Sequence, residues 1–289
     1  MSLRPRSVGE LLDGSFRLVR EDLGLYAMTT VAATLPFSVG SILTSVGAGS
    51  VSSAMTGFVA IIVGGVLMVI LYPTLMHQME VRLNGGVPDL STSAKFGSRM
   101  FFRMVWGWFL ATLGLMGAMM VVGVAVVLVA GLSAAFLGDG VLSGILMVVV
   151  GAAVFFTVGV WAMAGISLFL PGIVVERLTA IESLRRGFAL AKGGRFRIVA
   201  VLFVAWLLII IPVMAIYAVT GTLGMLTDPV AAAAGGVSGG RIVTQQVMAL
   251  GVSAFTTPLF VACFLLVYYD QRIRSEAFDV EAAVDELVS

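Results

Sequence analysis

The chain has 289 residues, of which 60% are hydrophobic and only 11% charged, and its formal net charge at pH 7 is +1. Its mean hydropathy is +1.09. Soluble domains devote about 25% of their residues to charged side chains, so this composition excludes a soluble globular protein and indicates one that crosses a membrane several times. We expect the lipid bilayer as its main partner and no nucleic-acid partner.

Six apolar runs are long enough to cross a hydrocarbon core, which takes about 20 residues. They cover roughly 24–45, 56–78, 105–130, 142–170, 197–225 and 246–269. Of the 17 Lys and Arg residues, only Arg241 then falls on the side of the membrane opposite the two termini. The positive-inside rule therefore predicts a multi-pass protein of the bacterial plasma membrane with both termini in the cytoplasm.

Two segments outside these runs carry the capping box of a helix start, which is a Ser or Thr followed three residues later by Glu. The boxes are Ser7 with Glu10 and Thr179 with Glu182. A Phe follows each box at the same distance, Phe16 in the first segment and Phe188 in the second. Each segment is therefore predicted to form a short helix.

The helix predicted at 179–192 is amphipathic. Its apolar side chains recur at helical spacing and comprise Leu178, Ile181, Leu184, Phe188 and Ala191. Arg185, Arg186 and Lys192 point elsewhere, and Gly193 and Gly194 end the helix. Such a helix is expected to lie flat in the headgroup region of a bilayer.

The chain looks like three copies of one unit, predicted at 7–82, 91–177 and 179–272. Each copy ends in an acid–base pair with an expected structural or interfacial role. The pairs are Glu80 and Arg82, Glu176 and Arg177, and Asp270 and Arg272. The second copy lacks a capping box, and coincidence is the alternative, because any six-span protein has charged cytoplasmic loops.

The predicted fold is therefore an all-α membrane protein. Its six transmembrane helices form three consecutive helical hairpins, and an amphipathic interfacial helix precedes each hairpin.

The first span carries a stripe of hydroxyl side chains at helical spacing, made of Thr30, Thr34, Ser38 and Ser41. Hydroxyl groups in lipid seek partners on neighbouring helices or on the carbonyls of the preceding turn, which predicts a packing face. The functional alternative is a cavity or a water-lined path between the spans.

The sequence offers little for catalysis. His77 is the single His, and together with Glu80 it supplies two potential metal ligands that nothing else in the chain completes. No nucleophile motif or pair of buried carboxylates is present. We therefore expect no catalytic residue, no metal site and no cofactor, and the protein is predicted not to be an enzyme.

The C-terminal segment 273–289 is predicted to form a further, acidic helix that Ser275 caps. Its acids are Glu276, Asp279, Glu281, Asp285 and Glu286. An anionic leaflet repels such a helix. We expect it to dock on the basic helices of this chain or to bind a basic membrane or cytoplasmic partner; a frayed, solvated terminus is the alternative.

Three motifs together resemble the glycerophosphoryl diester phosphodiesterase membrane-domain family of bacterial integral membrane proteins. They are Leu3-Arg4-Pro5 with Ser7-Val8-Gly9-Glu10-Leu11-Leu12 and Phe16, the central VERLTAIESLRRGFALAKGGRFR, and the closing YYDQRIRSEAFDVE. In some relatives such a domain precedes a phosphodiesterase domain, whose His and metal-ligand carboxylate motifs are absent from this chain. The resemblance implies a membrane-anchoring or accessory module without the hydrolase.

Two functions of different class follow from these observations. The first is a non-enzymatic membrane scaffold or accessory protein that binds partners through its basic helices or acidic tail. The second is a transporter or lipid-handling protein whose central cavity is lined by the hydroxyl stripe.

Overall fold

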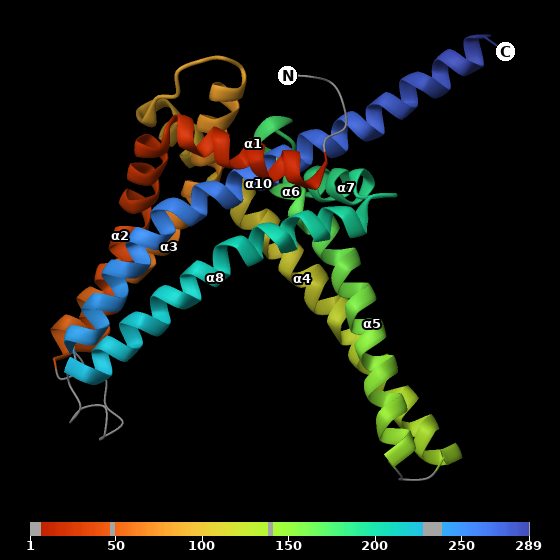
Figure 1. Ribbon diagram of the computed structural model, residues 1–289, viewed down its shortest axis with the longest axis horizontal. Coiled ribbons are helices and arrows are strands. Elements are labelled where there is room, and N and C mark those ends of the chain that lie inside the picture. Colours follow the sequence, from red (N-terminus) through yellow and green to blue (C-terminus); the bar gives the residue numbers. More distant parts are fainter. Residues whose placement is uncertain (1–6, 47–49, 138–140, 228–238, 289) are drawn as a thin grey trace. The chain divides into compact units, whose positions relative to one another are not determined.

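The chain is almost entirely helical in the residues that the computed structural model describes, which are 7–46, 50–137, 141–227 and 239–288 (Figure 1). No strand occurs in those ranges, which confirms the all-α prediction for them. The helices are α1 (Val8–Glu21), α2 (Leu23–Val46), α3 (Val51–Leu83), α4 (Leu90–Leu137), α5 (Val141–Ser167), α6 (Phe169–Val175), α7 (Ala180–Leu190), α8 (Arg195–Thr227) and α10 (Gly239–Val288).

Six of these helices, α2, α3, α4, α5, α8 and α10, contain stretches long and apolar enough to cross a membrane, as predicted. The stretch in α5 continues through α6 to Val175. The protein is therefore an integral membrane protein by the length and composition of its helices.

Two predicted helix boundaries are wrong. The segment 91–104 is not a separate interfacial helix, because α4 begins at Leu90 and continues without interruption into the span. Ser275 does not cap a new helix either, since α10 runs unbroken through it to Val288. Both segments lack a Pro that would end the helix, so the backbone hydrogen bonds continue. The side chains of 276–288 lie outside the described residues, and so does the predicted docking of the tail.

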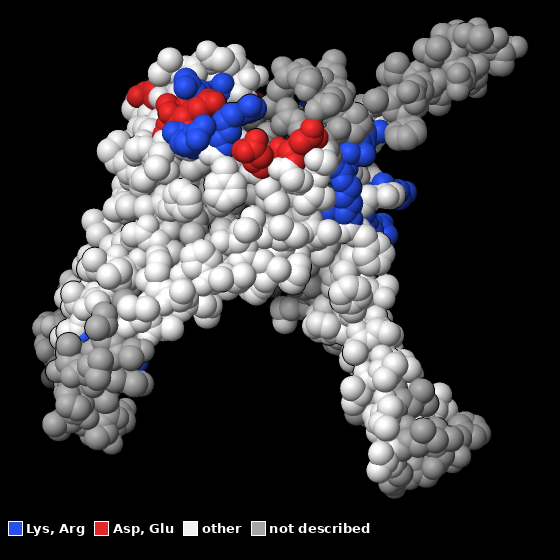
Figure 2. All heavy atoms as spheres, in the orientation of Figure 1, with Lys and Arg blue, Asp and Glu red and all other residues white. Residues whose placement is uncertain are grey.

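The chain divides into two units by its internal contacts. The first comprises Met1–Phe101 and Val201–Ile273, and the second comprises Phe102–Ala200 and Arg274–Ser289. These units differ from the three predicted repeats, whose boundaries stay a prediction. In Figure 2 a cluster of Lys, Arg, Asp and Glu side chains lies at the end of the first unit where α1 lies, and a few Lys or Arg atoms show at its opposite end.

In the first unit, α2 and α3 pack closely enough for their backbones to meet. A Cβ atom at Gly40 would lie 2.7 Å from the Gly57 carbonyl oxygen, and a Cβ at Gly57 would lie 2.8 Å from the Thr44 amide. Gly64 likewise faces the backbone of Phe37. Small residues allow this approach. The arrangement of the six spans as three hairpins stays a prediction.

The predicted helix start at Ser7 is present at the N-terminus of α1. The Glu10 amide donates to the Ser7 hydroxyl at 3.3 Å, and the Ser7 amide donates to the Glu10 carboxylate at 2.8 Å. The helix packs against α2 and α3 and buries Leu11, Ser15 and Leu18 on one face.

Candidate functional site

The second unit contains the groove that we describe as the candidate site, and α7 forms one wall of it. The helix starts where predicted, because the Thr179 amide and hydroxyl donate to the Glu182 carboxylate at 3.0 and 2.7 Å. The hydroxyl and then the amide of Thr179 lower the pKa of Glu182 below its ordinary value. Gly193, with φ 83°, reverses the backbone after the helix, as a left-handed glycine does.

α7 also buries a face within the protein that the sequence did not predict. This face consists of small residues and one leucine, namely Ala180, Ser183, Gly187 and Leu190, and small residues permit the closest helix contact. The predicted apolar side lies at the flank, where Ile181 is 52% exposed and Phe188 is partly buried. Its place in the headgroup region stays a prediction.

Backbone-level contacts attach α7 to α5 and α6. The Ser183 hydroxyl donates to the Phe169 carbonyl at 2.6 Å, and Gly172 lies directly opposite Ser183. A Cβ atom at Gly187 would collide with the Gly165 carbonyl oxygen. Ser183 and Gly187 stand four residues apart, a spacing that the sequence displays and from which this contact could have been recognised.

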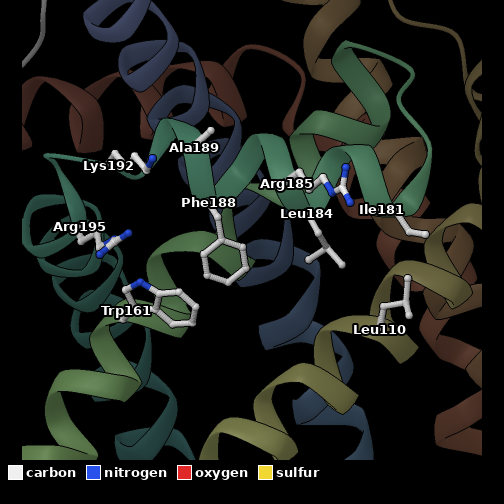
Figure 3. A pocket seen from close by; sticks show the side chains of 9 residues that line it. All are labelled: Leu110, Trp161, Ile181, Leu184, Arg185, Phe188, Ala189, Lys192 and Arg195. Carbon is white, nitrogen blue, oxygen red and sulfur yellow. The ribbon is translucent and has the colours of Figure 1, made fainter.

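The exposed flank of α7 forms an open groove of about 560 Å³ with α4 and α5 (Figure 3). Phe188 points from α7 toward Trp161 of α5, and the two ring centroids are 4.7 Å apart. Leu184 and Leu110 complete the apolar floor. The Phe188 ring also lies against Gly165, whose missing side chain leaves room for it. We call this feature the α7 groove.

Three basic residues line the α7 groove: Arg185, Lys192 and Arg195. The Arg195 guanidinium lies 5.6 Å from the centroid of the Trp161 ring, within reach of a cation–π interaction. Its Nε atom is buried and has no hydrogen-bond partner. Within the part of the chain that the structure describes, no carboxylate forms an ion pair with any of the three. The groove therefore combines an apolar floor with unneutralised positive charge.

A second cavity of about 260 Å³ adjoins the α7 groove between α4 and α5. The two share Leu110, Trp161, Leu184 and Phe188. The inner cavity is lined further by the small residues Ala111, Gly114 and Ala118. We call it the apolar slot. It leads from the positive edge of the groove into the portion of α4 and α5 that is apolar enough to span a membrane.

The first unit has a groove of about 490 Å³ beside α1, which we call the α1 groove. Counted from the two capping boxes, five of its residues stand at the same positions as residues that line the α7 groove. Asp13, Phe16, Arg17, Arg20 and Leu23 take the places of Arg185, Phe188, Ala189, Lys192 and Arg195. The α1 groove thus keeps the Phe and the cation at the place of Lys192, and it has Arg17 in place of Ala189. It has an acid and a Leu where the α7 groove has two arginines.

Members of the first two predicted acid–base pairs bond to residues of other helices. The Arg82 Nε atom, at the end of α3, lies 3.1 Å from both a Glu21 and an Asp22 carboxylate oxygen at the junction of α1 and α2. Glu80 is partly buried one half-turn earlier. Arg82 therefore attaches the end of the second span to the end of α1.

In the second unit, Glu176 and Arg177 also join different elements. The Glu176 carboxylate lies 3.3 Å from Arg186 Nε of α7. The Arg177 carbonyl accepts a hydrogen bond of 3.0 Å from Arg103 of α4. Arg177 has φ 55°, so the chain between α6 and α7 turns through a left-handed conformation there. Of the third pair, Asp270 is 3% exposed and Arg272 is partly buried.

The hydroxyl stripe of α2 is largely buried. Thr30 is fully buried, and Thr34 and Ser38 are each 6% exposed. The Thr30 and Thr34 hydroxyls donate to the Tyr26 and Thr30 carbonyls of their own helix at 2.8 Å. Ser41, which is partly exposed, donates to the Phe37 carbonyl at 3.0 Å. The protons of these three hydroxyl groups are therefore donated to carbonyl groups of α2 itself.

His77 belongs to a local contact in the first unit. Its Nδ1 atom lies 3.1 Å from the Ser93 hydroxyl, and its ring stacks on Phe96 at 4.4 Å between centroids. Among the described residues no group of three His, Cys, Asp or Glu side chains is placed to hold a metal ion.

The residue that caps α4, Asp89, was not among the predicted helix starts. The Asp89 carboxylate accepts hydrogen bonds from the Ser91 hydroxyl at 2.6 Å and from the Thr92 amide at 2.8 Å. The hydroxyl of Ser91, then the amide and hydroxyl of Thr92, lower the pKa of Asp89 from 3.8 to about 2. Asp is a preferred N-cap, and its place after Pro88 was the available signal.

Comparison with family models, with characterised proteins and with solved structures finds no significant match to this chain.

Proposed function

We propose that this protein is a non-enzymatic scaffold or accessory protein of a bacterial plasma membrane, with both termini in the cytoplasm. The observation that supports a scaffold over a transporter is the contact between α2 and α3. Gly40 of α2, the helix that carries the hydroxyl stripe, meets Gly57 of α3 there at backbone distance. Side chains buried in such a contact stabilise the helix pair and leave no room for a solute beside them.

The ion pairs support the same proposal. Arg82 holds the end of α3 to α1, and Glu176 holds the end of α6 to α7. Both connections fix a short helix to the end of a span. We infer that α1 and α7 are interfacial helices held in place as a cytoplasmic surface, on which the exposed basic residues and the acidic tail are available to partners.

The resemblance to the glycerophosphoryl diester phosphodiesterase membrane-domain family belongs to this proposal. Under it, the chain is an accessory module without the hydrolase. A lipid-handling protein is the second candidate, and the α7 groove favours it, because the groove joins an apolar slot to unpaired cations.

Native membrane complexes test the scaffold proposal. The protein is extracted from its own membranes in a mild detergent, and its particle mass is compared with that of the purified chain. A scaffold is expected to run as a larger assembly. A chain truncated after Ser275 should be released from it, and so should a full-length chain in which the five tail acids are changed to amides. If the extracted and purified chains have the same mass, the scaffold proposal is wrong.

Thiol accessibility tests the transporter alternative separately. Thr34→Cys and Ser38→Cys are made in a Cys263→Ser background and treated with a small water-soluble thiol reagent. Burial of the stripe predicts no reaction, whereas the exposed control Ser50→Cys should react quickly. Fast modification at both stripe positions would support a water-lined path and contradict the packing interpretation.

A further inference from the structure

We propose that the α7 groove and the apolar slot together bind one anionic phospholipid. The phosphate of the headgroup lies against Lys192 and Arg195, which stand together beside Trp161, with Arg185 further along α7 (Figure 3). One acyl chain enters the slot between α4 and α5. This inference goes beyond the scaffold proposal, and it requires only that α4 and α5 cross the membrane.

The first argument is the state of the three cations. Arg186 and Arg103, which are their neighbours in the second unit, are bonded to Glu176 and to the Arg177 carbonyl. Arg185, Lys192 and Arg195 have no such partner among the described residues. The protein thus leaves uncompensated the basic residues that face the groove, while it pairs those that face other helices.

The buried Nε atom of Arg195 is the second argument. A buried donor without an acceptor is costly, and the Trp161 ring under the guanidinium fixes the group in place without accepting this hydrogen bond. The terminal nitrogens of the same guanidinium are the donors that a phosphate in the groove would meet, and arginine binds phosphate through such charge-assisted hydrogen bonds. The Trp161 ring therefore holds a cation at the edge of the groove.

The third argument is the connection of groove and slot. Both are lined by Trp161, Leu184 and Phe188, so the positive edge continues directly into an apolar cavity. Gly114 lines the slot, and a Cβ atom built there meets nothing within 4 Å among the described atoms. A soluble anion would bind only the basic residues of the α7 groove and would leave the slot empty. A lipid without net charge would fill the slot but would not neutralise those basic residues. An anionic phospholipid has both chemistries in one molecule, and basic pockets between transmembrane helices bind such headgroups.

The α1 groove provides an internal control. It has Phe16 and Arg20 at the positions of Phe188 and Lys192 but Asp13 and Leu23 at those of Arg185 and Arg195. It therefore lacks both the guanidinium over the Trp ring and part of the positive charge. Neutralising its cations should leave lipid binding at α7 unchanged.

The test measures lipid binding to the full-length chain after its lipids have been removed in a neutral detergent. Phosphatidylglycerol or phosphatidylcholine is added, and bound lipids are counted by native mass spectrometry. We expect one phosphatidylglycerol to bind in preference to phosphatidylcholine. The double variant Lys192→Gln with Arg195→Gln should weaken that binding by roughly tenfold or more, because it removes charge-assisted hydrogen bonds. The matched control is Arg17→Gln with Arg20→Gln.

A second variant, Gly114→Leu, tests whether an acyl chain occupies the slot, because the added side chain fills the slot and does not change the cations. This variant should bind phosphatidylglycerol more weakly than the parent chain. Its unfolding temperature without lipid should equal that of the parent chain. Equal binding of the two lipids, or equal effects of the α7 and α1 double variants, would overturn the proposal. Complete competition by inorganic phosphate would assign the cations to a soluble anion and overturn it as well. If Gly114→Leu binds like the parent chain, the placement of the acyl chain in the slot is wrong. The mass of the native complexes tests the scaffold proposal, and lipid binding tests the phospholipid proposal. Either proposal can therefore be contradicted without the other.

Discussion

The carbonyl oxygen of Gly165 lies against Gly187, so that α5 and α7 meet without a side chain between them. We expect Gly187→Val to be strongly destabilising, because its branched side chain must separate the two helices. Overpacking of this kind costs about 1–3 kcal/mol. The measurement is thermal unfolding in detergent. Gly159→Ala is the control, since a Cβ at this position of α5 meets no described atom within 4 Å, and it should unfold at the same or a higher temperature.

The Ser183 hydroxyl should contribute through its hydrogen bond to the Phe169 carbonyl. Ser183→Ala removes this buried bond and keeps the small side chain, so we expect a loss of about 1 kcal/mol. Ser183→Val should cost more, because Gly172 lies directly opposite and leaves no room for two methyl groups. Equal unfolding temperatures for the two variants would show that the contact with Gly172 is loose.

The cap of α4 should give a characteristic pH dependence. Because the folded pKa of Asp89 is about 2, below its ordinary value of 3.8, its stabilising effect is complete above about pH 4 and is lost as the pH falls through about 2. Thermal unfolding followed from about pH 6 to about pH 2 should therefore show a loss in the parent chain that is smaller in Asp89→Asn, which caps without titrating. Asp89→Ala should unfold earlier at every pH. Identical pH profiles for the parent and Asp89→Asn would contradict the assignment.

The proposed orientation predicts which positions a membrane-impermeant thiol reagent reaches. In a Cys263→Ser background, Asp139→Cys and Gly235→Cys should be labelled from outside the cell. Lys95→Cys and Arg185→Cys should be labelled only after the membrane is opened, because the positive-inside rule places them in the cytoplasm. Labelling at position 185 in intact cells would reverse the orientation.

The spans and helix starts were predictable because their determinants are local. A run of apolar residues or a capping box at Ser7 or Thr179 needs no knowledge of the rest of the chain. The continuity of α4 was missed because a change from charged to apolar residues was read as a helix boundary. Composition decides where a helix lies relative to the membrane, whereas a helix ends only where its hydrogen bonds do.

The candidate site was only partly predictable. Phe188, Arg185 and Lys192 were noted as features of one helix, but their partners come from elsewhere in the chain. Trp161 stands within an apolar run and Leu110 within another, and no sequence pattern relates them to α7. The burial of Ser183 and Gly187 was missed because hydrophobic periodicity counts large side chains, while contact between helix backbones depends on small ones.

The division of α7 into two faces has a consequence for how this protein diversifies. Ala180, Ser183 and Gly187 hold the helix in place, whereas Arg185 and Lys192 face the groove and bear no part of that contact. Substitutions at Arg185 and Lys192 are therefore expected to change what the groove binds without loosening the contact of α7 with α5 and α6. At the place that Arg185 takes after its capping box, α1 has Asp13, so the two capped helices present different charges to their grooves.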